Sequence, residues 1–135
     1  MQERIFSAEI ESIPHVTAWI DEALERLDCS MKAQMQIDVA IDEIFSNIAR
    51  YAYPDKCGFV TIQHSFEEAS RLFSFTFIDQ GIPFDPLKHE DPDTSLDIPD
   101  RAIGGLGILL VKKTMDEISY HYRDGRNILR LKKTV

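Results

Sequence analysis

The chain has 135 residues, 44% of them hydrophobic and 28% charged, and its 15 basic and 23 acidic residues give a net charge of −8. This length and composition predict one soluble globular domain with its own core and exclude wholesale disorder. Such an acidic chain repels the phosphates of nucleic acids and of anionic membranes, so neither is expected as a partner.

The sequence has no apolar run of about 20 residues, which a membrane-spanning helix needs. Its first residues lack the basic head and apolar core of a secretory signal. Cys29 and Cys57 lie far apart and form no CxxC pair, which favours reduced thiols packed as small hydrophobic side chains. A cytoplasmic protein is therefore the expectation.

The first half of the chain predicts one strand and two helices. Residues 3–10 alternate loosely and are typical of an edge strand. Pro14 suits a first helical turn and opens a helix whose apolar residues continue to Leu27. Ser30 is the expected N-cap of a longer helix that reaches about Tyr53, where Pro54 ends it.

The second half predicts two hairpins separated by a loop and a helix. Residues 58–66 and 71–79 pair, with Phe73, Phe75 and Phe77 on one buried face. Residues 80–103 form a long loop, residues 104–107 open a helix, and residues 117–122 and 127–132 pair across an Asp124-Gly125 turn. This order predicts an α+β fold, a two-layer sandwich with helices on one face of a mostly antiparallel mixed sheet.

Two polar residues on the second helix are the first candidates for a site. Glu43 and Asn47 are four residues apart, so both side chains point the same way. They flank the apolar stripe of this helix, where they would border a half-buried cleft. A solvated helix face with a hydrogen bond between the two side chains is the alternative interpretation. The stripe consists of Ile37, Ile41, Ile44 and Ile48.

A carboxylate ends the second strand of the first hairpin. Alternation places Asp79 on the same face as the three phenylalanines, toward the helices. Burying a carboxylate at this position would destabilise the fold by several kcal/mol, unless hydrogen-bond donors surround it. The Asp79-Gln80-Gly81 sequence is equally typical of a simple turn at a strand end.

The loop over residues 80–103 is far longer than an ordinary connection and is rich in proline and acidic residues, which is typical of lids and binding loops. Three glycines follow it directly before a helix. Glycines permit close backbone approach, and the first amides of a helix bind anions. The pattern matches neither GxGxxG nor a P-loop, and a flexible hinge is the alternative interpretation.

In this order, the motifs resemble those of the Bergerat-fold (GHKL) ATP-binding domains, and among them most closely the stand-alone anti-sigma factor serine/threonine kinases of bacterial stress and sporulation control. Residues 42–53 (DEIFSNIARYAY) are similar to their N box. Residues 79–86 (DQGIPFDP) are similar to their first glycine box, and residues 104–118 (GGLGILLVKKTMDEI) to their second. The resemblance covers about residues 5–133.

The resemblance implies a role for each matching residue. Glu43 would be the general base, and Asn47 would offer its amide oxygen to Mg²⁺. Asp79 would accept a hydrogen bond from the adenine amino group, and Gly81 would let the backbone approach the base. The other residues expected to bind ATP are Arg50, Phe84, Arg101, Gly104, Gly105, Leu106 and Gly107.

Among these, Gly105 and Gly107 would line the phosphates through main-chain amides, and Arg101 would reach the γ-phosphate. Two positions depart from the family pattern. Tyr51 stands where the family often has histidine, and Pro83 stands where it often has a second glycine. Neither change removes a magnesium or adenine contact, but with Tyr51 at this position a role of that histidine does not carry over from the family.

The resemblance implies that residues 1–135 form one ATP- and Mg²⁺-dependent serine/threonine protein kinase, with residues 80–103 as its ATP lid. Its partners would be a sigma factor, which it sequesters, and a STAS-type anti-anti-sigma protein, which it phosphorylates, so that transcription is regulated by partner switching. A homodimer is expected from the resemblance alone. A non-catalytic, ATP-gated module that holds a partner is the alternative, and a detached histidine-kinase catalytic domain is a third.

Overall fold

The computed structural model describes residues 1–88 and 105–135. Three helices and five strands form its regular framework. The helices are α1 (Ile13–Arg26), α2 (Met31–Asn47) and α4 (Gly105–Thr114). The strands are β1 (Gln2–Ser7), β2 (Phe59–Glu67), β3 (Leu72–Asp79), β4 (Glu117–Arg123) and β5 (Arg126–Thr134). Three short helical turns connect them: η1 (Ile10–Ser12), η2 (Ile48–Ala52) and η3 (Pro86–Lys88).

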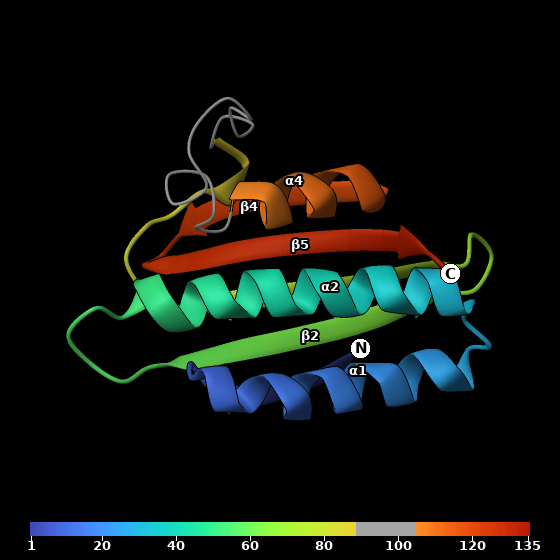
Figure 1. The fold of residues 1–135 in the computed structure, drawn as a ribbon, viewed down its shortest axis with the longest axis horizontal. Helices are drawn as coiled ribbons and strands as arrows, with labels where there is room; N and C mark the ends of the chain where they lie inside the picture. Colours follow the sequence, from blue (N-terminus) through green and yellow to red (C-terminus); the bar gives the residue numbers. More distant parts are fainter. Residues whose placement is uncertain (89–104) are drawn as a thin grey trace.

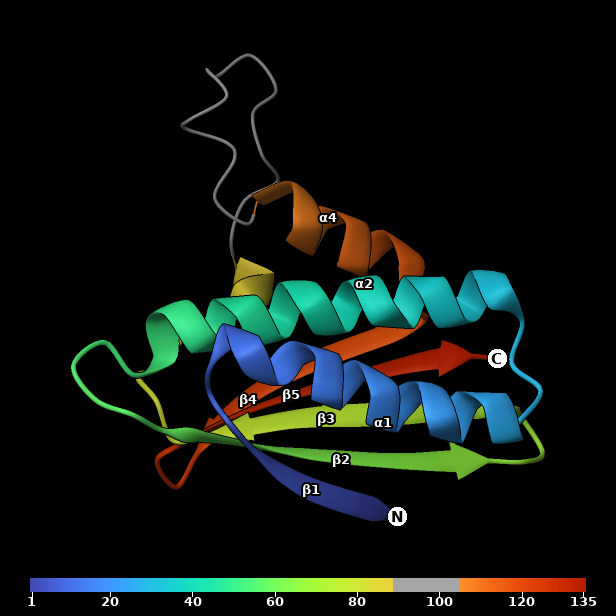
Figure 2. The same ribbon diagram turned by 60° about the horizontal axis from the view of Figure 1, so that its bottom comes forward.

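The strands form one five-stranded sheet in the order β1-β2-β3-β5-β4. All three helices lie on the same face of this sheet (Figures 1 and 2). The predicted α+β architecture, with its helices in one layer, is therefore confirmed. Each of the four pairings in the described part of the chain is antiparallel, so the parallel pair that a mixed sheet implies does not occur there.

The topology places the ends of distant strands side by side. Strand β5 inserts between β3 and β4, and in this register Asp79 at the end of β3 faces Asn127 near the start of β5. Two polar residues 48 positions apart in the sequence thus meet at one edge of the core.

The core lies between the sheet and the helices. Phe73, Phe75 and Phe77 of β3 are buried as their alternation predicts, and they pack with Ile37 and Ile41 of α2. The largest side chains with no measurable exposure also include Phe45, Ile20, Leu24, Ile62, Leu131, Val16 and Val60. This apolar layer fixes α2, which carries Glu43 and Asn47, against the sheet.

Helix α2 begins at the predicted N-cap, but its C-terminal end differs from the prediction. Its N-cap is Ser30, whose Oγ accepts a hydrogen bond from Ala33 N at 3.1 Å. At the other end, the α-helix stops at Asn47 and a wider π-helical turn continues to Ala52, before Tyr53. Isolated π-helical turns are rare and are frequently found at functional sites.

One further boundary differs in detail, and one predicted turn is found as expected. Strand β1 ends at Ser7, short of the predicted residue 10, because a 3-10 turn over Ile10–Ser12 leads into α1. The β4–β5 turn has positive φ at Asp124 (54°) and Gly125 (76°), as the type I′ prediction requires. No helix within residues 1–88 or 105–135 is long and apolar enough to cross a membrane.

Candidate functional site

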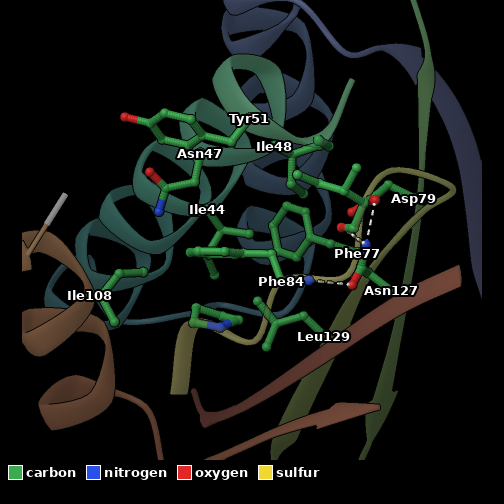
Figure 3. A pocket seen from close by; sticks show the side chains of 13 residues that line it. Ile44, Asn47, Ile48, Tyr51, Phe77, Asp79, Phe84, Ile108, Asn127 and Leu129 are labelled. Atoms are coloured by element: carbon green, nitrogen blue, oxygen red, sulfur yellow. Dashed lines mark hydrogen bonds between the residues drawn. The ribbon is translucent and has the colours of Figure 1, made fainter. Parts of the chain in front are cut away.

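A pocket with about 480 Å³ of empty space, part of it open to solvent, lies between α2 with its π-helical turn, strands β3 and β5, and the first turn of α4 (Figure 3). Most of its wall is apolar, and its polar side chains are few. The lining residues are Ile44, Asn47, Ile48, Tyr51, Ala52, Phe77, Asp79, Ile82, Phe84, Pro86, Ile108, Asn127 and Leu129.

Asp79 is the buried acidic group of the pocket, with 5% of its surface exposed. Its Oδ1 accepts hydrogen bonds from Gly81 N and from Asn127 Nδ2, both at 2.9 Å. Burial raises the pKa of Asp79, and these two donors oppose that rise. Within residues 1–88 and 105–135, Oδ2 receives no hydrogen bond, so one oxygen of the carboxylate is available to a ligand.

Gly81 is required by close backbone packing. A Cβ atom at this position would overlap the main chain of Ala52 in the π-helical turn. The contact is held by a hydrogen bond from Ile82 N to Ala52 O at 3.0 Å. The turn that follows Asp79 therefore lies directly against the end of the helix that carries Asn47.

Asn47 is half-buried in the pocket wall, and Figure 3 shows its side chain directed toward α4. Its side-chain amide forms no hydrogen bond with the residues that the structure describes. An unpartnered amide oxygen beside a pocket is a hard donor of the type that Mg²⁺ accepts alongside water and phosphate oxygens. The residue therefore fits the magnesium role implied by its motif.

Glu43 lies one helical turn before Asn47 and is half-buried, but it is not part of the pocket wall. Burial is the main cause that raises the pKa of Glu43, the negative charge of Asp42 adds to it, and the positive charge of Arg50 opposes it. A carboxylate with a raised pKa is a better proton acceptor than an ordinary surface glutamate.

Gly107, the third residue of α4, contacts the Glu43 carboxylate. A Cβ atom at Gly107 would overlap all three carboxyl atoms of Glu43. The N-terminal turn of α4, which starts at Gly105 and continues through Leu106, therefore lies next to this carboxylate. Free amides at a helix N-terminus attract negative charge, so the same turn suits a phosphate group.

The remaining predicted residues fall into three groups. Phe84 lines the pocket, and its N–H donates to Asn127 Oδ1 at 3.1 Å. Arg50 is exposed on the π-helical turn and does not line the pocket, although its charge acts on Glu43. Arg101 and Gly104 lie outside the described residues.

The sequence matches the model of the histidine kinase-like ATPase domain over residues 6–133. The chain belongs to this family. It is also 27% identical over 113 residues to the serine/threonine-protein kinase BtrW of Bordetella bronchiseptica, an alignment that covers 84% of this chain and 79% of that protein. Together with the motifs, these matches place the chain in the GHKL superfamily.

Solved structures show the same fold. The histidine kinase domain of the blue-light activated histidine kinase EL346 from Erythrobacter litoralis superposes with a TM-score of 0.57 at 16% identity. That match covers 90% of this ATPase domain and 60% of the other chain. A structure of EL346 itself gives a TM-score of 0.54 at 17% identity, over 78% of this chain and 31% of the other. The chain thus spans less than two thirds of these histidine kinase structures.

Two polar residues of this ATPase domain's pocket, Asn127 and Tyr51, are not among the site residues that the sequence predicts. The sequence predicts Asn127 only as the first residue of a strand, and Tyr51 only as a departure from a family pattern. The pairing of β3 with β5, which neither local motif encodes, places Asn127 opposite Asp79. Tyr51 could have been found from its position four residues after Asn47, on the same side of a continuing helix.

Proposed function

We propose that this ATPase domain is a Mg²⁺-dependent serine/threonine protein kinase that phosphorylates a STAS-type anti-anti-sigma protein and sequesters a sigma factor. The observation that carries the proposal is the convergence of Asp79, Asn47 and Glu43 around one pocket and the first turn of α4. The name of BtrW, a serine/threonine-protein kinase, supports a serine or threonine hydroxyl as the group that accepts the phosphoryl group.

Adenine recognition is assigned to the inner end of the pocket. Asp79 Oδ2 accepts a hydrogen bond from the exocyclic amino group, while Oδ1 remains held by Gly81 and Asn127. The apolar side chains of Ile48 and Phe77 pack against the flat base. This assignment explains why a carboxylate is retained at a buried position where an apolar side chain would otherwise be more stable.

The phosphate end is assigned to the outer part of the pocket, toward α4. Asn47 offers its amide oxygen to Mg²⁺, which neutralises phosphate charge when it is bound. The main-chain amides at Gly105 and Gly107 face the same region from the N-terminus of α4 and hold phosphate oxygens without a P-loop lysine.

Glu43 is assigned the proton transfer. Its carboxylate orients the serine or threonine hydroxyl of the substrate protein and accepts its proton. As that proton leaves, the hydroxyl oxygen forms a bond to the γ-phosphorus and the bond from the γ-phosphorus to the ADP oxygen breaks. Because Gly107 lets α4 approach so closely, Glu43 and the phosphate-binding turn are held at one place.

The test is phosphoryl transfer from labelled ATP to a purified STAS partner, with Glu43→Gln as the matched variant. Glutamine keeps the size of the side chain but cannot take a proton, so we expect ADP binding to persist and label transfer to fall by about 100-fold or more. Bound ATP without any label on the partner would refute the kinase assignment. Partner binding that depends on ATP would in that case identify the non-catalytic, ATP-gated module.

A further inference from the structure

Asn127 is a buried amide at the inner wall of the pocket, with 6% of its surface exposed. We propose that Asn127 is a positioning residue for base selection: it orients Asp79 toward adenine and ties that carboxylate to the backbone of residues 82–84, so that base recognition and the position of Phe84 depend on each other. The inference rests on the proposed ATP site and extends it to a residue outside all three motifs.

Every hydrogen-bonding position of the Asn127 side chain is occupied. Its Nδ2 donates to Asp79 Oδ1 and to Ile82 O, both at 2.9 Å. Its Oδ1 accepts from Phe84 N at 3.1 Å and from the Tyr120 hydroxyl. An amide has two N–H donors and two acceptor lone pairs, so no capacity remains for a ligand. Asn127 therefore acts through its neighbours.

The orientation of this amide follows from its partners. Ile82 O can only accept and Phe84 N–H can only donate, so Nδ2 must face the first and Oδ1 the second. Nδ2 then also faces Asp79, as Figure 3 shows by the dashed lines between these side chains. Donors on Oδ1 stabilise the negative carboxylate more than a carboxyl group protonated on Oδ2, so the network favours the ionised form of Asp79.

The ionised state of Asp79 decides which base the pocket accepts. A carboxylate oxygen accepts a hydrogen bond from the amino group of adenine but repels the carbonyl oxygen that guanine carries at the same place. A protonated carboxyl group would reverse this preference, because it can donate to the guanine carbonyl. Asn127 thus sets the selectivity for adenine through the protonation of Asp79.

The same side chain holds the beginning of the segment after β3. Phe84 lines the pocket, and its amide is bonded to Asn127 Oδ1. Tyr120 reaches this oxygen from β4, so three strands and the segment after Asp79 meet at one amide. A shift of Asp79 on nucleotide binding is therefore transmitted to the main chain at Phe84 through Asn127, in addition to the direct bond from Gly81 N to Asp79.

The experiment compares the binding of Mg·ADP and Mg·GDP by calorimetry in the full chain and in Asn127→Leu. Leucine has the same branched skeleton of side-chain heavy atoms and forms no hydrogen bond. We expect ADP to bind about 10- to 100-fold more weakly, the usual effect of removing a hydrogen bond to a charged group. We also expect the ADP-to-GDP affinity ratio of the variant to fall as pH is lowered, because Asp79 has lost a donor that opposes protonation.

A pH effect can be assigned to Asp79 because, within the described residues, the titratable groups coupled to its charge are Tyr53 and Tyr120, whose pKa values that charge raises. Burial raises the pKa of both hydroxyls, so both stay neutral at physiological pH. In wild type, ADP should protect the Phe84 amide from hydrogen exchange, and in Asn127→Leu this protection should be weaker.

Thr76→Val is the matched control. Thr76 is also buried and hydrogen-bonded, to Arg130 Nε at 3.3 Å, but it does not line the pocket. The Thr76→Val protein should be less stable than wild type, and its ADP-to-GDP affinity ratio should be unchanged. If Asn127→Leu fails to fold, Tyr120→Phe removes one donor to the same oxygen and should weaken ADP binding about 2- to 10-fold.

The outcomes separate the two proposals. Absence of ADP binding by wild type contradicts the proposed function itself. Wild-type binding with an unchanged affinity and ADP-to-GDP ratio in Asn127→Leu, or in Tyr120→Phe when that is the variant available, overturns the role of Asn127 alone.

Discussion

Replacing Gly107 by alanine tests whether the contact between α4 and Glu43 serves catalysis. The new Cβ atom would overlap the Glu43 carboxylate, so this carboxylate must move. Because it is the far end of a flexible side chain, the displacement costs about 0.5–1.5 kcal/mol in rotamer strain. Alanine is better than glycine in a helix by about 0.8–1 kcal/mol, which offsets this cost.

The expected result is a variant whose free energy of unfolding is within about 1 kcal/mol of wild type. Phosphoryl transfer, in contrast, should be about 100-fold slower, because a misplacement of about 1 Å in a reacting group costs this much. The affinity for ADP should change far less, since the main-chain amide at Gly107 is kept. Urea denaturation, calorimetry and single-turnover transfer to the STAS partner measure the three quantities separately.

Gly125→Ala provides a control with the opposite pattern. Gly125 has φ of 76° and no atom near its Cβ direction, so alanine there is strained by its backbone alone. It should lose about 1–2 kcal/mol of stability and keep the wild-type transfer rate. A Gly107→Ala protein that transfers phosphate as fast as wild type refutes the positional role of this contact.

Three further predictions concern charges and a helix cap. Asp42→Asn removes a negative charge that raises the pKa of Glu43, so the acidic limb of the transfer rate against pH should move to lower pH; an unmoved limb contradicts the assignment of Glu43 as base. Asp38 is a carboxyl group whose pKa is raised to about 8 by burial and by Asp21, and the buried Oδ1 of each residue has no hydrogen-bond partner among the described residues. The folded chain thus retains a proton that the unfolded chain has lost, and stability falls as pH rises from the ordinary aspartate range to about 8. In urea denaturation, Asp38→Asn should remove this dependence of stability on pH and should be more stable than wild type at pH of about 8. An unchanged pH dependence would contradict the raised pKa of Asp38 beside Asp21. Ser30→Ala should cost about 1 kcal/mol in the same measurement, and no loss would mean that the cap hydrogen bond is not stabilising.

Local patterns were sufficient for most of the fold. The cap at Ser30 and the alternation of Phe73, Phe75 and Phe77 depend on residues close together in the sequence, and both are found as expected. The same alternation correctly placed Asp79 on the inner face. These features could be predicted because period and capping chemistry are set within a few residues.

Long-range contacts could not be predicted in the same way. The position of Asn127 beside Asp79 requires the β3–β5 pairing, and the approach of Gly107 to Glu43 requires the packing of α4 on α2. The π-helical turn after Asn47 also has no local signal in the sequence. Its wider path is associated with the contact of Ala52 with Gly81, which is distant in the sequence. Each of these features depends on tertiary contacts that outweigh local propensity.

The most direct test of the central claim is calorimetric titration of the chain with ADP in excess Mg²⁺, beside Asp79→Asn. Wild type should bind, and the variant should bind about 10- to 100-fold more weakly because a charged acceptor has been replaced by a neutral amide. No heat of binding in wild type, or equal affinity in Asp79→Asn, would contradict an adenine nucleotide held by the carboxylate at the end of β3.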